Sequence, residues 1–162
     1  MLCYFTSMLI CGVLLVHSSD SVAHNDPCKT HGQHGNQCAL AGKWRNQYKS
    51  EMTIFCQNAT FTGQYTDIIG DPTQNYVLVG KYIPVNNTEY ITGWSVAFKN
   101  EYHDDMSVKS WSGVFYAAHG NIKTHWVHAK YVKPNDYWRT FSTNQDTFIR
   151  TSSDPCLPNS AG

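Results

Sequence analysis

The sequence predicts an all-β fold, an eight-stranded antiparallel up-and-down β-barrel, and three features support it. Apolar and polar residues alternate with a period of two from Cys38 onward, as in strands with one buried face. The alternating segments are rich in Val, Ile, Thr, Tyr, Phe and Trp, and none has convincing helical periodicity. Gly, Pro, Asn or Asp lie between most segments, which is typical of short turns between strands.

The expected strands follow one another with short links. They are residues 40–47, 51–58, 61–67, 76–83, 90–100, 107–117, 122–131 and 139–149. Closing such a sheet on itself removes its edges, and a barrel of about eight strands has an interior wide enough for one small ligand. The pattern alone also allows a sandwich of two sheets.

The parity of each strand predicts which side chains face inward. These faces combine rings with polar groups near one end of the strand: Trp44, Asn46 and Tyr48; Trp94, Val96, Phe98 and Asn100; Ser107, Lys109, Trp111 and Gly113; Thr124, Trp126 and His128; Asn144, Asp146 and Phe148. A dry core rarely tolerates this, because each unsatisfied polar group costs about 1–3 kcal/mol. A ligand cavity tolerates it, since the ligand completes the hydrogen bonds.

The first 23 residues read as a secretory signal peptide. The apolar run Met8–Val16 is too short to span a bilayer, and Ser21 and Ala23 suit a cut before His24. A membrane anchor is the alternative. We expect a secreted, extracellular protein without a membrane span after this segment.

Residues 24–37 are polar, with Gly and Pro and no periodicity, so we expect a flexible N-terminal extension. Its His24, His31 and His34 could bind a metal, but we favour a solvated tail and assign no metal site. The barrel domain is expected over residues 38–150, with a C-terminal tail over 151–162.

The charge and the cysteines limit the partners and the environment. Twelve basic residues balance twelve acidic ones without a basic block, which argues against nucleic acid as a partner. Outside the signal peptide stand Cys28, Cys38, Cys56 and Cys156, an even number that favours disulfides. Three pairings are open, of which we favour 28–156 with 38–56, and buried thiols are the alternative.

Two triplets fit the acceptor pattern for N-glycosylation. They begin at Asn58 and Asn86, and both lie near predicted strand ends, where a glycan has room.

Several motifs resemble the avidin and streptavidin family of biotin-binding proteins. They are "GKWRNQYKS", "FTGQYTDIIG", "GWSVAFKNEYHDD", "WSGVFY", "KTHW" and "QDTF", in family order and near-family spacing across residues 38–149. Single motifs would be weak, but all of them in register make the resemblance specific. It implies a barrel that binds biotin as a ligand, with no cofactor and no catalysis.

The resemblance assigns the polar contacts of biotin. Asn46, Ser50 and Tyr65 match three donors to the ureido oxygen, and Asp146 matches the carboxylate that accepts a ureido N–H. Hydrogen bonds that converge on one carbonyl oxygen favour its charge-separated form and count for more in a dry site.

The resemblance also assigns the walls of the site. Phe98, Trp111 and Trp126 match the rings around the thioether ring, with Phe98 in place of a Trp. Trp94, one step deeper, is expected to close the barrel floor.

The remaining assignments concern the ends of the ligand and the neighbouring subunit. Ser107 and a backbone N–H near Asp71 match contacts to the valerate carboxylate, and residues 70–75 match the loop over the ligand. Trp138 matches a Trp that enters a neighbouring subunit's site, which implies a homo-oligomer, normally a tetramer.

Two residues depart from the family pattern inside the site. Asp67 stands in place of a Ser or Thr, and Lys109 in place of a Thr near the thioether ring. Because a lone buried charge is strongly disfavoured, we expect these two to form an ion pair. The alternative is that Lys109 extends to the barrel mouth.

Other departures concern the rim and the outer surface. His128 replaces a Leu and could approach the ligand's carboxylate, or be a solvated rim residue. The cysteine that pairs with the Cys38 equivalent in avidin is absent near Phe115. Thr143 and Gln145 are polar where the family packs dimer on dimer, so a dimer is the alternative to a tetramer.

The sequence therefore predicts a secreted, non-catalytic protein that sequesters biotin. One alternative is an enzyme, although no nucleophile–base pairing, metal-ligand spacing or phosphate loop is visible. The other is a barrel that has lost or altered biotin binding, and that binds another small molecule or serves as a matrix or defence protein. Asp67 and Lys109 keep this second alternative open.

Overall fold

A computed structural model of the chain describes residues 38–69, 72–100 and 105–156. In these ranges the strands are β1 (Gly42–Asn46), β2 (Glu51–Gln57), β3 (Thr60–Thr66), β4 (Tyr76–Pro84), β5 (Glu89–Asn100), β6 (Asp105–Tyr116), β7 (Asn121–Lys130) and β8 (Phe141–Ser152). Each strand pairs antiparallel with its neighbour in sequence, and β1 pairs with β8 to close the barrel. The predicted up-and-down barrel is confirmed, and the sandwich is excluded.

The last strand is where the prediction was least accurate. Residues before it form the 3-10 helix η2 (Pro134–Arg139), with Pro at the start of the helix. Proline suits this position because it has no N–H to donate and its φ is already helical. β8 therefore begins two residues later than predicted, and it ends three residues later, at Ser152. A second short 3-10 helix, η1 (Ala117–His119), follows β6.

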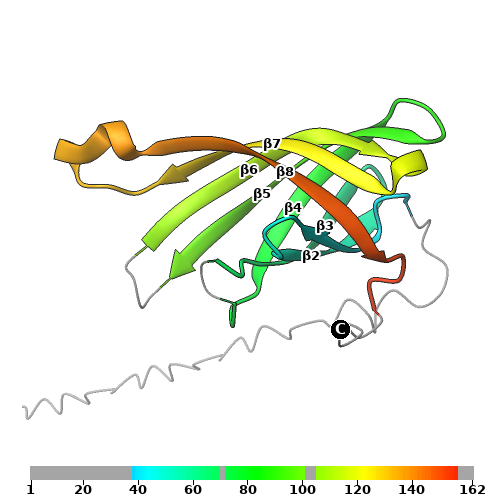
Figure 1. Cartoon of the computed structure of the whole chain (residues 1–162), viewed down its shortest axis with the longest axis horizontal. Coiled ribbons are helices and arrows are strands. Elements are labelled where there is room, and N and C mark those ends of the chain that lie inside the picture. The colour runs from blue at the N-terminus through cyan, green and yellow to red at the C-terminus, as the bar shows by residue number, and fades with distance from the viewer. Residues whose placement is uncertain (1–37, 70–71, 101–104, 157–162) are drawn as a thin grey trace, which may run out of the picture.

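Because the strands run alternately up and down, successive connections lie at opposite ends of the barrel. We call the end that carries the connections after β1, β3, β5 and β7 the mouth, and the opposite end the floor. Figure 1 shows the strands wrapped into the barrel, with η2 at the extremity of the long β7–β8 pair. Among the described residues, no helix is long and apolar enough to cross a membrane.

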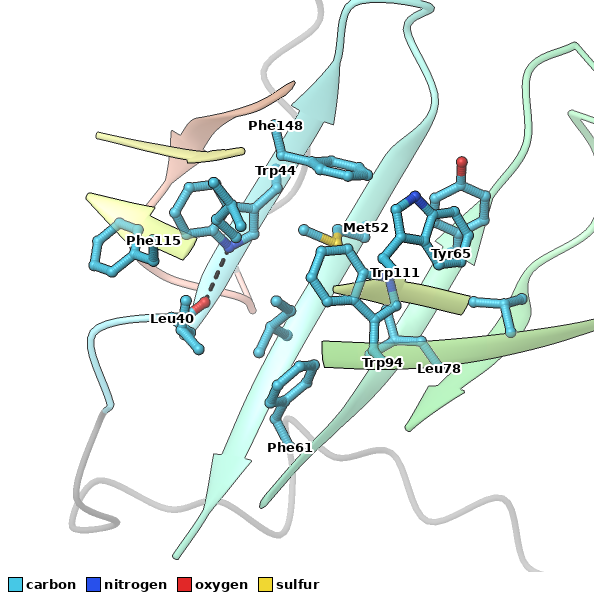
Figure 2. Close-up of a cluster of buried hydrophobic side chains, with 13 residues drawn as sticks. Leu40, Trp44, Met52, Phe61, Tyr65, Leu78, Trp94, Trp111, Phe115 and Phe148 are labelled. Atoms are coloured by element: carbon cyan, nitrogen blue, oxygen red, sulfur yellow. Dashed lines mark hydrogen bonds between the residues drawn. The ribbon is translucent and has the colours of Figure 1, made fainter. Parts of the chain in front are cut away.

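The floor is filled by large apolar side chains, as the alternation predicts. Trp94 is buried, stacks on Trp111 with ring centroids 5.6 Å apart, and meets the edges of Phe61 at 6.2 Å and Phe148 at 5.5 Å. Figure 2 shows this cluster, which comprises Leu40, Trp44, Met52, Ile54, Phe61, Tyr65, Leu78, Trp94, Val96, Trp111, Phe115, Ile122 and Phe148. Trp94 is therefore a core residue that closes the floor.

Several polar groups at the floor are bonded by the chain itself, although Trp94 Nε1 and Asn121 Oδ1 are buried without a hydrogen-bond partner among the described residues. Trp44 Nε1 donates to the Leu40 carbonyl at 2.9 Å, the dashed line in Figure 2. The Arg150 guanidinium lies 4.3 Å from the Trp44 ring centroid and donates to the carbonyls of Ala39 and Ala41. These contacts tie the segment that enters β1 across the end of the barrel.

A disulfide joins Cys38 to Cys56, with the Cα atoms 5.9 Å apart, so this half of the favoured pairing is confirmed. Cys156 is also disulfide-bonded, and its partner lies outside the described residues. The 28–156 pairing stays a prediction, because Cys28, like the signal peptide, the extension and its histidines, lies outside the described residues.

Candidate functional site

A cavity of about 340 Å³ lies at the mouth of the barrel. Its size falls within the range of ligand pockets, about 300–1,000 Å³. Its walls combine polar groups with aromatic rings: Asn46, Tyr48, Ser50, Tyr65, Asp67, Ile69, Tyr76, Phe98, Ser107, Lys109, Trp126, His128 and Asn144. Nine of these were predicted as ligand contacts from the sequence, and all nine are brought together here.

The turn after β1 fixes the orientation of Asn46. The Asn46 side-chain oxygen accepts the backbone N–H of Tyr48 at 3.0 Å and of Ser50 at 2.9 Å. Lys49 in this turn has a φ of 71°, the left-handed conformation that lets the chain fold back on the amide. Since the oxygen is occupied by the backbone, the Asn46 NH₂ group is the part left to donate to a ligand.

Ser50 and Tyr65 stand beside Asn46 and differ in their partners. The Ser50 hydroxyl donates to Asp67 Oδ1 at 3.2 Å, and the Ile69 backbone N–H donates to the same oxygen at 3.2 Å. Burial raises the pKa of Tyr65 well above its usual range; the Ser50 hydroxyl opposes this, and the carboxylates of Asp67 and Asp146 add to it. Tyr65 is therefore a neutral phenol, and can donate, throughout the physiological pH range.

The aromatic wall is built around Phe98, which is half-buried at the mouth end of β5. Its ring meets Tyr76 at 4.8 Å, Tyr65 at 6.1 Å and the His128 ring at 6.4 Å, all edge to face. Because four rings fix one another's orientation, they form a preorganised apolar wall.

Lys109 occupies the cavity wall with its ammonium turned inward. Its Nζ lies 3.7 Å from Asp146 Oδ2, 3.9 Å from the centroid of Trp126 and 4.8 Å from that of Trp111. The predicted ion pair with Asp67 is therefore wrong in its partner. The two indole faces attract the ammonium toward Asp146, whereas Asp67 is held by Ser50 and the Ile69 N–H.

The side chain of Lys109 is only 18% exposed, so the alternative of a lysine extended to the mouth is also wrong. Burial lowers the pKa of Lys109, and the charges of Asp146 and Asp67 oppose that shift, with a hydrogen bond to Asp146 as a smaller contribution. The ion pair with Asp146 therefore offsets only part of the effect that desolvation of the ammonium has on the pKa of Lys109.

Asp146 is almost completely buried, at 1% exposed, and is held by its own partners. Trp111 Nε1 donates to Oδ2 at 2.8 Å, and Gln47 Nε2 donates to Oδ1 at 3.2 Å. Neither Trp111 nor Asp146 is among the residues that line the cavity, although both were predicted as ligand contacts. Lys109 contacts both and lines the cavity in their place, because it is much longer than the Thr of the family pattern.

The other predicted site residues divide into three groups. Ser107 and His128 line the cavity, at the mouth ends of β6 and β7. Trp138 lies on η2, is 72% exposed and does not line this cavity, so its predicted role in a neighbouring subunit stays a prediction. Asp71 lies outside the described residues, as do parts of the loop 70–75.

Four lining residues were not predicted as ligand contacts: Tyr48, Ile69, Tyr76 and Asn144. Parity places Asn144 on the inward face with Asp146, and it could also have found Tyr76, which shares the inward face of the buried Leu78. Tyr48 and Ile69 lie in turns, where alternation gives no direction.

The fold and the cavity define a class of protein. A closed barrel whose mouth holds a small cavity, part polar and part aromatic, has the form of a small-molecule-binding site. In the described part of the chain, no three His, Cys, Asp or Glu side chains are grouped to hold a metal ion.

The chain belongs to the avidin family. A sequence model of that family matches residues 34–151, well over half of the chain. The resemblance stated from the motifs is thereby confirmed.

Proposed function

We propose that this protein is a secreted, non-catalytic binding protein that sequesters biotin at the mouth of its barrel. The observation that carries the proposal is the convergence of Asn46, Ser50 and Tyr65 on one buried corner of a cavity with aromatic walls. A small apolar ring system with one polar carbonyl end fits such a site, since the rings cover its body and the three groups bind the carbonyl oxygen.

Each group of the polar corner has a distinct part in this proposal. The Asn46 NH₂ and the Tyr65 O–H donate to the ureido oxygen. The Ser50 hydroxyl turns from Asp67 to the same oxygen, which leaves Asp67 Oδ1 able to accept a ureido N–H. Exchanging one partner for another in this way leaves both the Ser50 hydroxyl and Asp67 Oδ1 with a hydrogen-bond partner.

The remainder of biotin lies along the wall of rings. Phe98, Tyr76 and Trp126 pack the fused rings, while Ser107 and His128 face the carboxylate tail together with a backbone N–H near Asp71. Trp111 and Asp146 contribute through Lys109, which stands between them and the cavity.

The proposal is tested by pull-down on immobilised biotin, with and without an excess of free biotin. We expect the wild-type protein to be retained and to be released by the free vitamin. The matched control is Tyr65→Phe, which removes one hydroxyl and no carbon, and which should be retained less in the same wash. Wild-type protein that passes through the resin would contradict the proposal.

A second candidate is a family barrel with an altered ligand. It is favoured by the position of the Lys109 ammonium, 3.9 Å from the centroid of Trp126, where the ring of a bound ligand would pack. In that case the protein would bind another small molecule, or serve as a matrix or defence protein, and it would fail the pull-down.

We also propose that the protein is a homo-oligomer, a tetramer or alternatively a dimer, in which Trp138 completes the site of a neighbour. The exposure of Trp138 and of apolar side chains on the outer face of the barrel, such as Val77, Val79 and Val127, supports this. Light scattering after gel filtration gives the mass directly; a monomer would contradict it.

Secretion is proposed from the signal peptide and the disulfides. Asn58 and Asn86 are exposed in turns at the floor, where a glycan would not reach the cavity. Mass spectrometry of protein from culture medium should find a chain that begins at His24, with glycosidase-sensitive mass at one or both asparagines.

A further inference from the structure

We propose that Lys109 is a specificity-determining residue, which makes the cavity prefer a biotin-like ligand with an oxygen on its sulfur over the plain thioether. The inference rests on the proposed function, because it takes the ureido end to lie at Asn46, Ser50 and Tyr65. Biotin has its sulfur at the opposite end of the fused rings. We take the ring that carries the sulfur to lie against Lys109 and Trp126, which line the same cavity.

The surroundings of the Lys109 ammonium carry the inference. Among the described residues, its contacts are Asp146 Oδ2 at 3.7 Å and the faces of Trp126 and Trp111 at 3.9 and 4.8 Å. The carboxylate distance is longer than a charge-assisted hydrogen bond of about 2.8 Å. An ammonium carries three N–H donors, and ring faces accept them only weakly.

A ligand that lies against this wall therefore meets an ammonium whose carboxylate partner, Asp146, stands 3.7 Å away and which has further N–H groups to donate. A thioether sulfur is a weak acceptor, and its ring has to share the face of Trp126 with the ammonium. A sulfoxide or sulfone oxygen is a strong acceptor and projects outward from the ring. It can reach Nζ while the ammonium stays paired with Asp146, so the buried charge gains a partner.

The cavity wall around Lys109 presents hydrogen-bond donors of the protein rather than acceptors. Its cross-strand neighbour on β7 is His128, and Ser107 precedes it on the same face of β6, so two further side chains able to donate stand beside it. Both carboxylates of the site, Asp67 and Asp146, are engaged by donors of the protein.

The test compares the dissociation constants of biotin, the two biotin sulfoxide diastereomers and biotin sulfone, measured by calorimetry on the wild-type protein, Lys109→Met and Lys109→Thr. The readout is the ratio of biotin to sulfone dissociation constants. We expect this ratio to fall by about tenfold or more in both variants, because each removes the ammonium. Near-ultraviolet circular dichroism checks that the variants keep their aromatic packing.

The matched control is Ser107→Ala on the same face of β6. It should change the affinity for all four ligands by a similar factor and leave the ratio unaltered. If neither Lys109 variant folds, measurements on the wild-type protein alone still test the role of Lys109. One sulfoxide diastereomer, the one whose oxygen points at Nζ, should then bind at least about tenfold tighter than the other.

The outcomes separate the two proposals. Suppose that the wild-type protein binds biotin. If the folded Lys109 variants then show the same ratio of dissociation constants, or if both sulfoxide diastereomers bind equally, only the role of Lys109 is overturned. Wild-type protein that binds none of the four ligands would overturn the proposed function, and this inference with it.

Discussion

The floor and the mouth of this barrel are made by the same strands and yet are chemically opposite. On β6, Trp111 and Phe115 are buried among rings toward the floor, whereas Ser107 and Lys109 line the cavity at the mouth. On β8, Phe148 is fully buried and Asn144 faces the cavity. On one inward face, a distance of only a few residues therefore separates the dry core from the surface of the cavity.

The difference lies in how buried polar groups find partners. At the floor the chain supplies partners to several of its own groups, as the Leu40 carbonyl does for Trp44, and within the described ranges it leaves Trp94 Nε1 and Asn121 Oδ1 buried without a hydrogen bond. At the mouth the polar groups satisfy one another only in part, and the Asn46 NH₂ group and the Lys109 ammonium line the cavity. The floor supplies stability and the mouth supplies recognition, and substitutions at the two ends should separate these properties.

The largest expected effect on stability is at the floor. Phe148→Ala removes a fully buried ring that packs against Trp94. We expect a loss of about 4 kcal/mol in the free energy of unfolding, measured by urea denaturation, because the cavity cannot close. Phe141→Ala, in the same strand but 69% exposed, is the control and should lose less than about 0.5 kcal/mol. Equal losses would contradict the division between floor and surface.

The next effect is at the buried ion pair of the mouth. Asp146→Asn keeps the shape but removes the charge that faces Lys109 and an acceptor for Trp111 or Gln47. We expect a loss of about 3 kcal/mol, since it leaves the ammonium desolvated without its partner. Adding Lys109→Met to Asp146→Asn should recover part of this loss. Strictly additive losses in the double variant would mean that the two side chains do not interact.

The pH dependence of stability gives a smaller effect with a defined sign. The pKa of Lys109 is lowered in the fold, mainly by burial, below the unfolded value of about 10.4. Between these two values the unfolded chain binds a proton that the folded chain lacks, so Lys109 makes stability rise with pH in this window. Tyr65 has a raised pKa and acts oppositely, making stability fall above about pH 10.

The measurement is urea unfolding between about pH 7 and pH 10. The stability of wild-type protein relative to Lys109→Met should increase toward the upper end of that range. Lys123→Met, on the exposed face of β7, controls for the loss of a surface lysine. A difference between wild type and Lys109→Met that is constant with pH would contradict the buried ammonium.

The smallest effect is expected at an ion pair on the outer surface. Arg45 and Glu51 approach to 2.6 Å on neighbouring strands, but their side chains are well exposed. Arg45→Gln should lose less than about 1 kcal/mol, because water screens such pairs. A loss as large as that of Asp146→Asn would show that solvent exposure does not separate the two pairs.

Much of the fold could be predicted from the sequence, because the alternation of apolar and polar residues indicates both where a strand lies and which of its faces points inward. Parity places Trp94 and Phe98 on one inward face, as the structure shows, and the resemblance assigned the first to the floor and the second to the cavity. The start of β8 was missed because η2, opened by Pro134, carries residues that also suit a strand.

The site was predictable as a set of residues but not as a set of contacts. Parity for Lys109 and Asp146, together with the resemblance for Asp67, brings the three residues to one cavity region, yet neither can say which carboxylate a flexible lysine side chain reaches. That choice depends on the indole faces of Trp111 and Trp126, which are placed by the register of the two neighbouring strands β6 and β7. Tyr48 and Ile69 were missed because turns carry no alternation.

The most direct test of the account is a calorimetric titration of biotin into the wild-type protein and into Tyr65→Phe. The account predicts saturable binding to wild type and an affinity about tenfold weaker in the variant, because one buried donor to the ureido oxygen is gone. No heat with wild type at millimolar biotin, or the same dissociation constant for both proteins, would contradict it.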